Sequence, residues 1–583
     1  MTTSHVPRKQ RSISEQLLST LRADIDSRRI GHGMNLLTNV SRITDSFDPS
    51  AKNAAAFLGI LAEWTDLGFG NLDLIKKLIA SYSAVTRSKL PICDYIPLRM
   101  TEGMVAMTEE MLDSAIEHFA IVLKLADEIS AWDILAIVNY WIARCQRKKG
   151  QYEKALIHVR KAREVQSAHG HVQNEVPARV LESLILFENG NPKQALSGLR
   201  DSEVILRQTD DYVTRGNIES TYGRILEREL RFGQAIEHYT RAIEQFRKGD
   251  SKYVHVARTM VDMSFSRIQM ARRLRRSIEA YPDQQKNESR MAPRSAFVKE
   301  LSSLYAVIVK DLDYAAGIYA NNPNARGIAR VHLYRGYLSL DMGKLDLAAQ
   351  QAVKAYLAAE SKRDFILMAS SRNLQCMIEN ARVEDEVEGW TDHAVASQDY
   401  AGDAIELANN TQNRRLLAFV YIWHGLTLSN GFFGAQNRAR DGARDAMEKA
   451  ALYIEPGVKD FIWEDFQILK KRLSESTTIA PKLIQWAHGE IGEKTFKQLE
   501  EDFADLVIPR LWEQEKRKIS RAAERLSISP RKVRRVLIRL GLMEAESRSD
   551  NGRHKPGAPA NPQNARGEKR KMKSRNIISP RTA

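Results

Sequence analysis

The residues with the clearest chemical potential are cationic side chains near the C-terminal end of the sequence. They are Arg521, Arg531, Lys532, Arg534, Arg535 and Arg539. An arginine guanidinium can donate two parallel hydrogen bonds to a guanine edge or to a phosphate, and a lysine ammonium pairs with phosphate as a point charge. This cluster therefore predicts contact with nucleic acid.

The net charge of the chain is concentrated in the same region. Of the formal charge of +15, residues 516–547 contribute +7 and residues 548–583 contribute +8, so the first 515 residues are formally neutral. A balanced body with a cationic end is typical of proteins that bind a polyanion. A basic tail can also aid solubility or bind acidic protein surfaces, and charge alone does not separate these roles.

Two other short motifs resemble chemical sites but lack essential parts. In the sequence GEIGEKT at 489–495, Glu493 separates Gly492 from Lys494, whereas a phosphate-binding loop needs this glycine and lysine adjacent. We interpret this segment as a break between helices. His169 and His171 have no further ligands at a familiar metal-binding spacing, so we interpret them as part of a surface loop. The common catalytic motifs are also missing from the sequence, and we predict a protein that is not an enzyme and that holds no metal or cofactor.

The composition is that of a folded, water-soluble chain, with 43% hydrophobic and 28% charged residues. Its three cysteines, Cys93, Cys145 and Cys376, are far apart and predict neither a disulfide framework nor a zinc site. No run of about 18 apolar residues occurs, and the N-terminal stretch 1–16 is polar and basic. We expect a cytoplasmic protein without a membrane partner.

Two short predicted helices position the cationic cluster. Ser520 is expected to cap the first, and Ser529 followed by Pro530 marks the start of the second, which should end at Gly541. Residues 527–529 form the turn between them. Helices joined by so short a turn match the helix-turn-helix, whose second helix enters the DNA major groove.

The second helix has an apolar face and a cationic face. Its apolar stripe is Val533, Val536, Leu537 and Leu540, and the five cations from Arg531 to Arg539 fall off that stripe. We predict that the base edges are contacted by Arg531, Lys532 and Arg535, that phosphates are contacted by Arg521, Arg534 and Arg539, and that Ser529 and Pro530 also lie at the DNA. The alternative is an ordinary amphipathic helix pair that packs on the rest of the chain with its arginines in solvent.

The segment resembles the Fis-type helix-turn-helix found at the C-terminus of bacterial regulators. The shared features are the alanine pair 522–523, the short turn 527–529 and the closing Leu-Gly-Leu at 540–542. A preceding amphipathic helix from about Thr495, with Phe496, Leu499, Phe503, Leu506 and Val507, extends the resemblance over residues 495–546. It implies a bacterial, nucleoid-associated protein that binds double-stranded DNA.

This sequence departs from the Fis-type pattern at three positions. Ser527 replaces the usual turn glycine, which costs about 1 kcal/mol if the position needs a positive φ. Arg525 replaces an apolar residue, and Pro530 stands where the family often has a base-contacting arginine. The last departure weakens any transfer of the family's base recognition.

The long body of the chain repeats itself at a constant step of 40. Alanines recur at Ala115, Ala155, Ala195 and Ala235, small residues at Gly103, Ala143, Ser183 and Gly223, and large apolar residues at Phe119, Val159, Leu199 and Tyr239. A small residue lets a second helix approach closely, and a large one fills the space between units. The pattern predicts stacked helix pairs, with Trp132, Trp141 and Trp423 in the helical core.

The repeats resemble the tetratricopeptide family, through Ala143, Gly150, Tyr152, Ala155 and Ala162, and again through Gly336, Gly343, Leu345, Ala348 and Ala355. The family's unit is about 34 residues, so a step of 40 implies longer helices or loops. We predict an all-α fold: N-terminal helices at 15–95, with a degenerate repeat among them, a repeat superhelix at 96–460 with an inserted loop near 281–294, and connecting helices at 461–494. Residues 401–450 are a candidate degenerate unit, with Gly425 and Ala446 as its small positions.

Both ends of the chain are predicted to be disordered, at 1–14 and 547–583. The basic cluster Lys569, Arg570, Lys571, Lys573 and Arg575 would contact phosphates without reading sequence. We expect a sequence-specific transcriptional regulator whose repeat groove binds an unknown protein or peptide and offers a surface for a homodimer. The alternative is a scaffold protein whose basic end binds nucleic acid or acidic partners nonspecifically.

Overall fold

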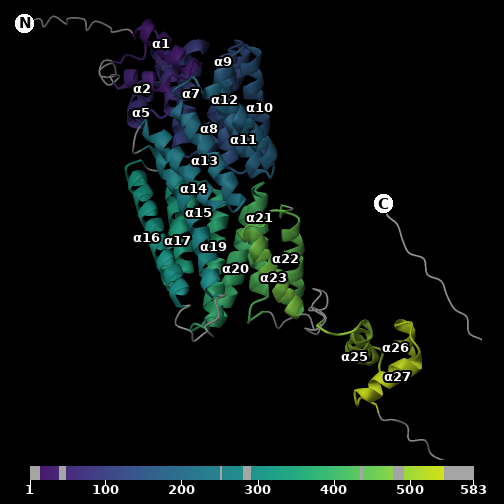
Figure 1. Ribbon diagram of the computed structural model, residues 1–583. Coiled ribbons are helices and arrows are strands. Elements are labelled where there is room, and N and C mark those ends of the chain that lie inside the picture. Colours follow the sequence, from purple (N-terminus) through teal and green to yellow (C-terminus); the bar gives the residue numbers. More distant parts are fainter. Residues whose placement is uncertain are drawn as a thin grey trace, which may run out of the picture. The chain divides into compact units, whose positions relative to one another are not determined.

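The computed structural model describes residues 13–38, 47–249, 253–279, 291–322, 324–433, 437–455, 457–476 and 492–543 (Figure 1). Within these ranges every regular element is a helix, and the chain divides into two compact units, 1–477 and 478–583. The predicted all-α fold is confirmed. The expected disorder of 1–14 and 547–583 concerns segments that fall, apart from Ile13 and Ser14, outside the described residues.

The first unit is an array of helices that pack on their neighbours in sequence. Its helices are α1 (Glu15–Asp26), α2 (Ile30–Leu37), α4 (Ala54–Asp66), α5 (Leu72–Ala80), α6 (Ala84–Ser88), α7 (Ile92–Thr108), α8 (Leu112–Glu128), α9 (Trp132–Lys148), α10 (Tyr152–Ala168), α11 (Val172–Glu188), α12 (Pro192–Leu206), α13 (Tyr212–Arg228), α14 (Phe232–Arg247), α15 (Val254–Glu279), α16 (Met291–Asn321), α17 (Ala325–Asp341), α18 (Leu345–Glu360), α19 (Phe365–Glu384), α20 (Trp390–Asn409), α21 (Arg414–Leu428), α22 (Asn437–Ala451) and α23 (Phe461–Ser476).

The predicted repeat is confirmed by the helix boundaries. From α7 to α14 the helices begin at positions 92, 112, 132, 152, 172, 192, 212 and 232, so two helices make one repeat. The alanines Ala115, Ala155, Ala195 and Ala235 are completely buried. A Cβ built on Gly103 would lie 2.5 Å from the ring of Phe119, and that ring also lies 5.4 Å from the ring of Trp141 in the next repeat. The small and large positions therefore hold each pair, and successive pairs, together as predicted.

Similar turns join most of these helices. A residue with positive φ recurs once per helix, at Glu110, Ser130, Gly150, Gly170 and Gly190, and again at Leu230. The next residue donates its N–H to a carbonyl in the last turn of the helix, as Gln151 does to Gln146 at 2.9 Å. This is the Schellman motif, which satisfies the carbonyls left free at a helix end. The regular turns keep the repeats in register.

The later part of the array differs from the prediction in two places. The inserted loop was expected near 281–294, but Met291–Arg294 are the first turn of α16, and 280–290 lie outside the described residues. Residues 461–476, expected to connect the domains, form α23, which packs into the array: a Cβ on Gly425 of α21 would lie 2.7 Å from Leu469. The degenerate unit is thus the pair α21 and α22, completed by α23.

The array winds far enough for distant repeats to touch. Gln412 donates its backbone N–H to the carbonyl of Gly150 at 2.8 Å, and Arg326 donates its backbone N–H to Glu110 at 2.7 Å. Arg228 pairs with Glu455 at 3.1 Å. Each contact joins helices that are many repeats apart in the sequence. These contacts fix the curvature of the first repeats, and with it the shape of their inner surface.

In the second unit, the described residues 492–543 form a bundle of three helices, α25 (Phe496–Gln514), α26 (Ile519–Arg525) and α27 (Pro530–Arg539). Its small core consists of Ile508, Leu511, Ala522, Ala523, Val533, Val536 and Leu537. Two details differ from the sequence analysis. Lys518, not Ser520, is the N-cap of α26, and Leu540, the last residue of the expected apolar stripe, is 39% exposed. On α25, Phe496 and Phe503 are exposed as well.

Candidate functional site

The N-terminus of α27 has the predicted cap. The Ser529 hydroxyl accepts a hydrogen bond from the backbone N–H of Lys532 at 3.2 Å, and Pro530 is the first helical residue. Val533, Val536 and Leu537 face the core, where they are at most 4% exposed. The cap and the buried stripe together fix which side of α27 points outward.

Arginines dominate the outward side of α27. At about 3.6 residues per turn, Arg531 and Arg535 lie about 40° apart, on the side opposite the buried residues. Both are exposed, as are Arg534, Arg539 and, on α26, Arg521. Neither Arg531 nor Arg535 forms an ion pair within the described part of the chain. Their donors are therefore available to an anionic partner.

Two other cations of α27 contact carboxylates of α25. Lys532 Nζ lies 2.7 Å from Glu500 Oε1, and Arg539 pairs with Asp505. These ion pairs fix α27 against α25, and both lie partly in solvent, where such pairs contribute little stability. Lys532 was predicted to contact bases and Arg539 to contact phosphate; in this structure both pair with carboxylates of α25.

The turn between α26 and α27 is strained at one residue. Ser527 has φ of 50°, and the following residue, Ile528, donates its N–H to Ala523 at 3.0 Å. The position therefore requires the left-handed conformation that favours glycine. The predicted phosphate contacts at Lys569, Arg570, Lys571, Lys573 and Arg575 lie outside the described residues.

The array contains a second candidate site, for which the sequence analysis named no residues. A cavity lies against the inner face of α9, α11 and α13, the first helices of three successive repeats. One complete face of α9 lines it, from Trp132 and Asp133 through Tyr140 and Arg144 to Lys148. Because α9 forms one wall from end to end, the cavity is elongated.

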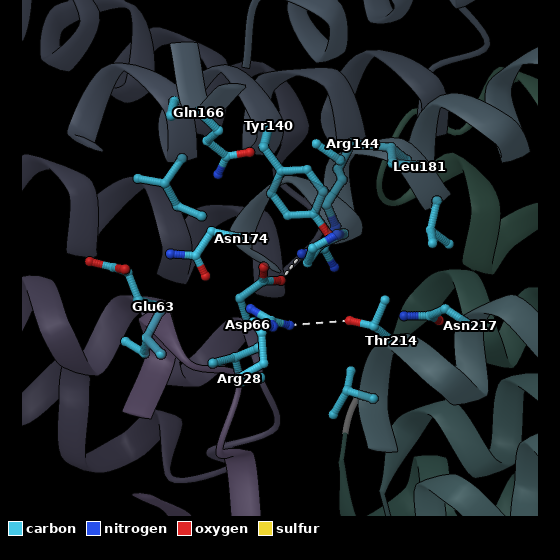
Figure 2. Close-up of a pocket in the computed structure, with 18 of the residues that line it drawn as sticks. Arg28, Glu63, Asp66, Tyr140, Arg144, Gln166, Asn174, Leu181, Thr214 and Asn217 are labelled. Carbon is cyan, nitrogen blue, oxygen red and sulfur yellow. Dashed lines mark hydrogen bonds and ion pairs between the residues drawn. The ribbon is translucent and has the colours of Figure 1, made fainter. Parts of the chain in front are cut away.

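Helix α1 and the end of α4 cover this cavity (Figure 2). Arg28 Nε donates to Asp211 Oδ2 at 2.7 Å, and Arg28 Nη2 donates to Thr214 Oγ1 at 3.1 Å. Asn174 Nδ2 donates to Asp26 Oδ1 at 2.9 Å. Since these bonds join α1 and the turn after it to α11 and α13, the N-terminal helices close over the inner surface of the repeats.

Most cations of the cavity are neutralised by carboxylates. Arg22 forms a two-point pair with Glu63 at 2.8 and 2.7 Å. Figure 2 shows the pair between Arg144 and Asp66. Burial raises the pKa of Glu63, and the charge of Arg22 opposes that rise.

Lys148 and Arg258 differ, because neither has a carboxylate partner among the described residues. Burial lowers the pKa of Lys148 to about 8 and that of Arg258 to about 10. Arg258 does donate a hydrogen bond to Asn217 Oδ1 at 2.7 Å. Burial also holds the pKa of His255 well below its ordinary value, with Arg258, Arg144 and Lys148 adding to that effect. An anion at this place would relieve the cost of two buried positive charges.

Some signals of this cavity were visible in the sequence but were interpreted differently. His169 is exposed in the turn between α10 and α11, as the predicted surface loop requires, but it stacks on Trp132 with 4.2 Å between ring centroids, and His171 lines the cavity. Trp132 was expected in the core and instead lines the cavity, whereas Trp141 is completely buried. Helical periodicity alone does not separate a core face from a cavity face.

Within the described residues, no three or more His, Cys, Asp and Glu side chains are grouped to hold a metal ion. No helix in that part of the chain is long and apolar enough to cross a membrane.

No family model matches the sequence, and no curated protein matches it either. Several solved structures are similar in fold. A Rap protein complexed with competence and sporulation factor has a TM-score of 0.48 at 11% identity, covering 68% of this chain and 100% of that one. The apo form of the quorum sensor NprR from B. thuringiensis has a TM-score of 0.44 at 13% identity, covering 68% and 98%. NprR in complex with its cognate peptide NprX has a TM-score of 0.37 at 13% identity, covering 58% and 92%.

Proposed function

We propose that the protein is a DNA-binding transcriptional regulator, in which α26 and α27 bind duplex DNA and the repeat array binds a ligand or partner that controls this activity. One observation carries the proposal: Arg531 and Arg535 lie exposed on the side of α27 opposite the core, with no acidic partner in the described structure. A helix of this kind, preceded by a short turn and a second helix, suits the major groove.

The outward face of α27 is matched to DNA in its chemistry. Arg531 and Arg535 are close enough around the helix to reach neighbouring bases, where each can pair with a guanine. Arg521 on α26 and Arg534 and Arg539 at the sides of α27 would contact backbone phosphates, Arg539 in exchange for its ion pair with Asp505. A nucleoid-associated protein in the bacterial cytoplasm fits this role, and the excess of basic residues in the C-terminal part of the sequence adds to the attraction.

The experiment compares the salt dependence of DNA binding for three proteins. They are the wild type, the double variant Arg531→Gln and Arg535→Gln, and a control with one arginine replaced, Arg525→Gln. Arg525 is exposed but pairs with Glu515 at 2.8 Å, away from the outward face of α27. Each phosphate contact that is lost should reduce the slope of log K against log salt by about 0.9, and each lost base pairing should cost about 1–3 kcal/mol.

We expect the double variant to lose at least tenfold in affinity for its preferred site, with the control within about twofold of wild type. A loss of binding free energy in the double variant that is only twice the loss in the control, in proportion to the charge removed, would mean that total charge matters and that α27 has no specific place on DNA. That result would favour a scaffold whose basic end binds nucleic acid or acidic partners nonspecifically.

A homodimer would strengthen DNA binding, because paired half-sites about 34 Å apart would engage two copies of α27. Analytical ultracentrifugation of the full-length protein, alone and with a two-site duplex, tests this part of the proposal. We expect two protomers per duplex, and a single protomer at every concentration would contradict it.

A further inference from the structure

We propose that the cavity covered by α1 binds a phosphate dianion held by Lys148 and Arg258, either inorganic phosphate or the phosphate group of a small monoester. The inference deepens the proposed function, on which it rests for the view that the repeat array binds a ligand. It is carried by unpartnered donors, by unpaired charge and by the size of the cavity.

Two helices bring cationic and polar side chains to one part of the cavity wall. Arg147 and Lys148 are in the last turn of α9. His255 and Arg258 lie about one turn apart at the start of α15. The charges of Lys148 and Arg258 both act on the imidazole of His255. The charge of Arg147 acts on Arg258, so the ends of α9 and α15 gather the four side chains in one region.

Three nitrogen atoms of this group are buried without a hydrogen-bond partner in the described part of the chain. They are Nε of Arg147, Nε of Arg258 and Nδ1 of His255. One Nη atom of each guanidinium is occupied: Arg147 Nη1 pairs with Glu188 at 2.9 Å, and Arg258 Nη2 donates to Asn217 at 2.7 Å. A buried polar group without a partner is destabilising. Phosphate oxygens can accept from several such donors at once, in charge-assisted hydrogen bonds.

Lys148 and Arg258 also leave two positive charges unbalanced. At pH 7 both remain protonated, because their pKa values of about 8 and about 10 lie above it. Water in the cavity would accept their hydrogen bonds but would supply no charge, and a single chloride would balance only one of the two. A dianion balances both.

The carboxylates whose charges act on these two cations are held by other groups. Glu110, which acts on Lys148, accepts the backbone N–H of Arg326 at 2.7 Å. Asp262, which acts on Arg258, is bound by two other arginines. Neither carboxylate forms an ion pair with Lys148 or Arg258 within the described ranges.

The acidic residues that line the cavity act on another part of its wall. Asp26 and Asp133 both act on the pair formed by Arg22 and Glu63. Asp133 lies in the first turn of α9 and Lys148 is its last residue. At a rise of about 1.5 Å per residue, their backbone positions are about 22 Å apart along the helix. Negative charge is therefore in excess beside α1 and α4, and positive charge is in excess at the ends of α9 and α15 that meet there.

The size of the cavity limits the ligand to a few heavy atoms. Its volume is about 160 Å³. A cavity of about 150 Å³ in another protein holds one benzene molecule, so phosphate or a monoester with a short carbon chain fits, and a nucleotide does not. The hydrogen bonds of Arg28 to Asp211 and Thr214 hold α1 over the cavity.

The test titrates the full-length protein by calorimetry with inorganic phosphate and with methyl phosphate. At about pH 7.5 both titrants are largely dianions, and about 150 mM chloride screens binding to surface cations. We expect one saturable site per chain. Acetate, a monoanion, should bind at least about tenfold more weakly, and adenosine monophosphate should not compete, because it is too large for the cavity.

The two titrants distinguish the sources of the phosphate group. Methyl phosphate that binds at least about tenfold more tightly than inorganic phosphate assigns the site to a monoester. Inorganic phosphate that binds equally well or more tightly assigns it to the free ion.

Lys148→Met and Arg258→Gln test the two cations. Each should weaken phosphate binding about 10- to 100-fold, because a hydrogen bond to a charged group is lost. Without ligand, each variant should melt at the same temperature as wild type or higher, since an unpaired buried charge has been removed. A cation that served folding alone would give the opposite pattern, with a lower melting temperature. Lys154→Gln, at an exposed site on α10, is the control and should bind phosphate as wild type does.

Three results would overturn the inference: no saturable binding of either titrant up to about 10 mM, unchanged phosphate affinity in both test variants, or acetate that binds as tightly as phosphate. The double variant Arg531→Gln and Arg535→Gln should bind phosphate as tightly as wild type, and loss of the site in that protein would place the phosphate on α27 and also overturn it. Failure to bind DNA with phosphate binding intact would refute the regulator and leave this site in place.

Discussion

The left-handed turn at Ser527 leads to a prediction about stability. Replacing Ser527 by glycine should stabilise α26 and α27, because a residue with a side chain is strained at φ of 50° and glycine is not. Ser527 is exposed, so the replacement removes little packing. The change isolates the backbone conformation of the turn that orients α27.

The magnitude follows from two opposing terms. The left-handed conformation costs a residue with a Cβ about 1–2 kcal/mol, whereas glycine gives the unfolded chain extra freedom worth about 0.5–1 kcal/mol. The net gain is about 0.5–1 kcal/mol. Amide exchange that occurs by opening of this unit should therefore slow about two- to fivefold. Ser529→Ala should act oppositely by about 1 kcal/mol, because it removes the cap on Lys532.

Hydrogen exchange of the full-length protein, read by mass spectrometry on peptides from α26 and α27, measures both effects. Peptides from α9 and α10 in the array serve as an internal control and should exchange equally in all three proteins. Exchange in the Ser527→Gly variant that is unchanged or faster would refute the assignment of this turn and the orientation of α27 that follows from it.

Three further predictions concern other parts of the structure. Burial raises the pKa of Glu227 to about 7 from 4.5, so the folded array retains a proton that the unfolded chain loses between these pH values. The free energy of unfolding of the array should therefore fall as the pH rises from 4.5 to 7. Above pH 7, Glu227→Gln should be more stable than wild type by up to about 3 kcal/mol, measured by denaturant titration at several pH values. Gly223→Ala should destabilise the array by about 1–3 kcal/mol, since the added Cβ would lie 2.6 Å from the ring of Tyr239, and an unchanged denaturation midpoint would refute this packing. Glu500→Gln should release Lys532 and increase the magnitude of the slope of log K against log salt for DNA binding by up to about 0.9. An unchanged slope would place Lys532 away from phosphate.

Periodicity made the repeat region predictable. The columns at Ala115 and Ala155 fixed the step of the repeat because a close helix contact tolerates only a small side chain, and the structure buries both completely. Capping chemistry was equally informative at Ser529 and Pro530. The hydrogen bond from the Lys532 N–H to the Ser529 hydroxyl and the pyrrolidine ring of Pro530 fix the start of α27. These are local rules, which depend on residues within a few positions of one another.

The cavity could not be predicted by such rules. Arg28 and Asp211 are 183 positions apart, and nothing local to either residue indicates that α1 folds back over the repeats. Lys148 has the usual place of a cation in the last turn of a helix, and only the three-dimensional structure shows it without a carboxylate partner, among the described residues, beside a cavity. The start of α26 at Ile519 was missed for a different reason, because Ser520 is a good cap residue one position inside the helix.

Selection of bound sites from a random pool of duplexes tests the central proposal most directly. The full-length protein is used at about 150 mM salt, where nonspecific attraction to phosphates is already weakened. We predict that one sequence motif is enriched, and that it is no longer enriched by the double variant Arg531→Gln and Arg535→Gln. Recovery of DNA without an enriched motif, or the same motif from the variant, would contradict sequence reading by α27.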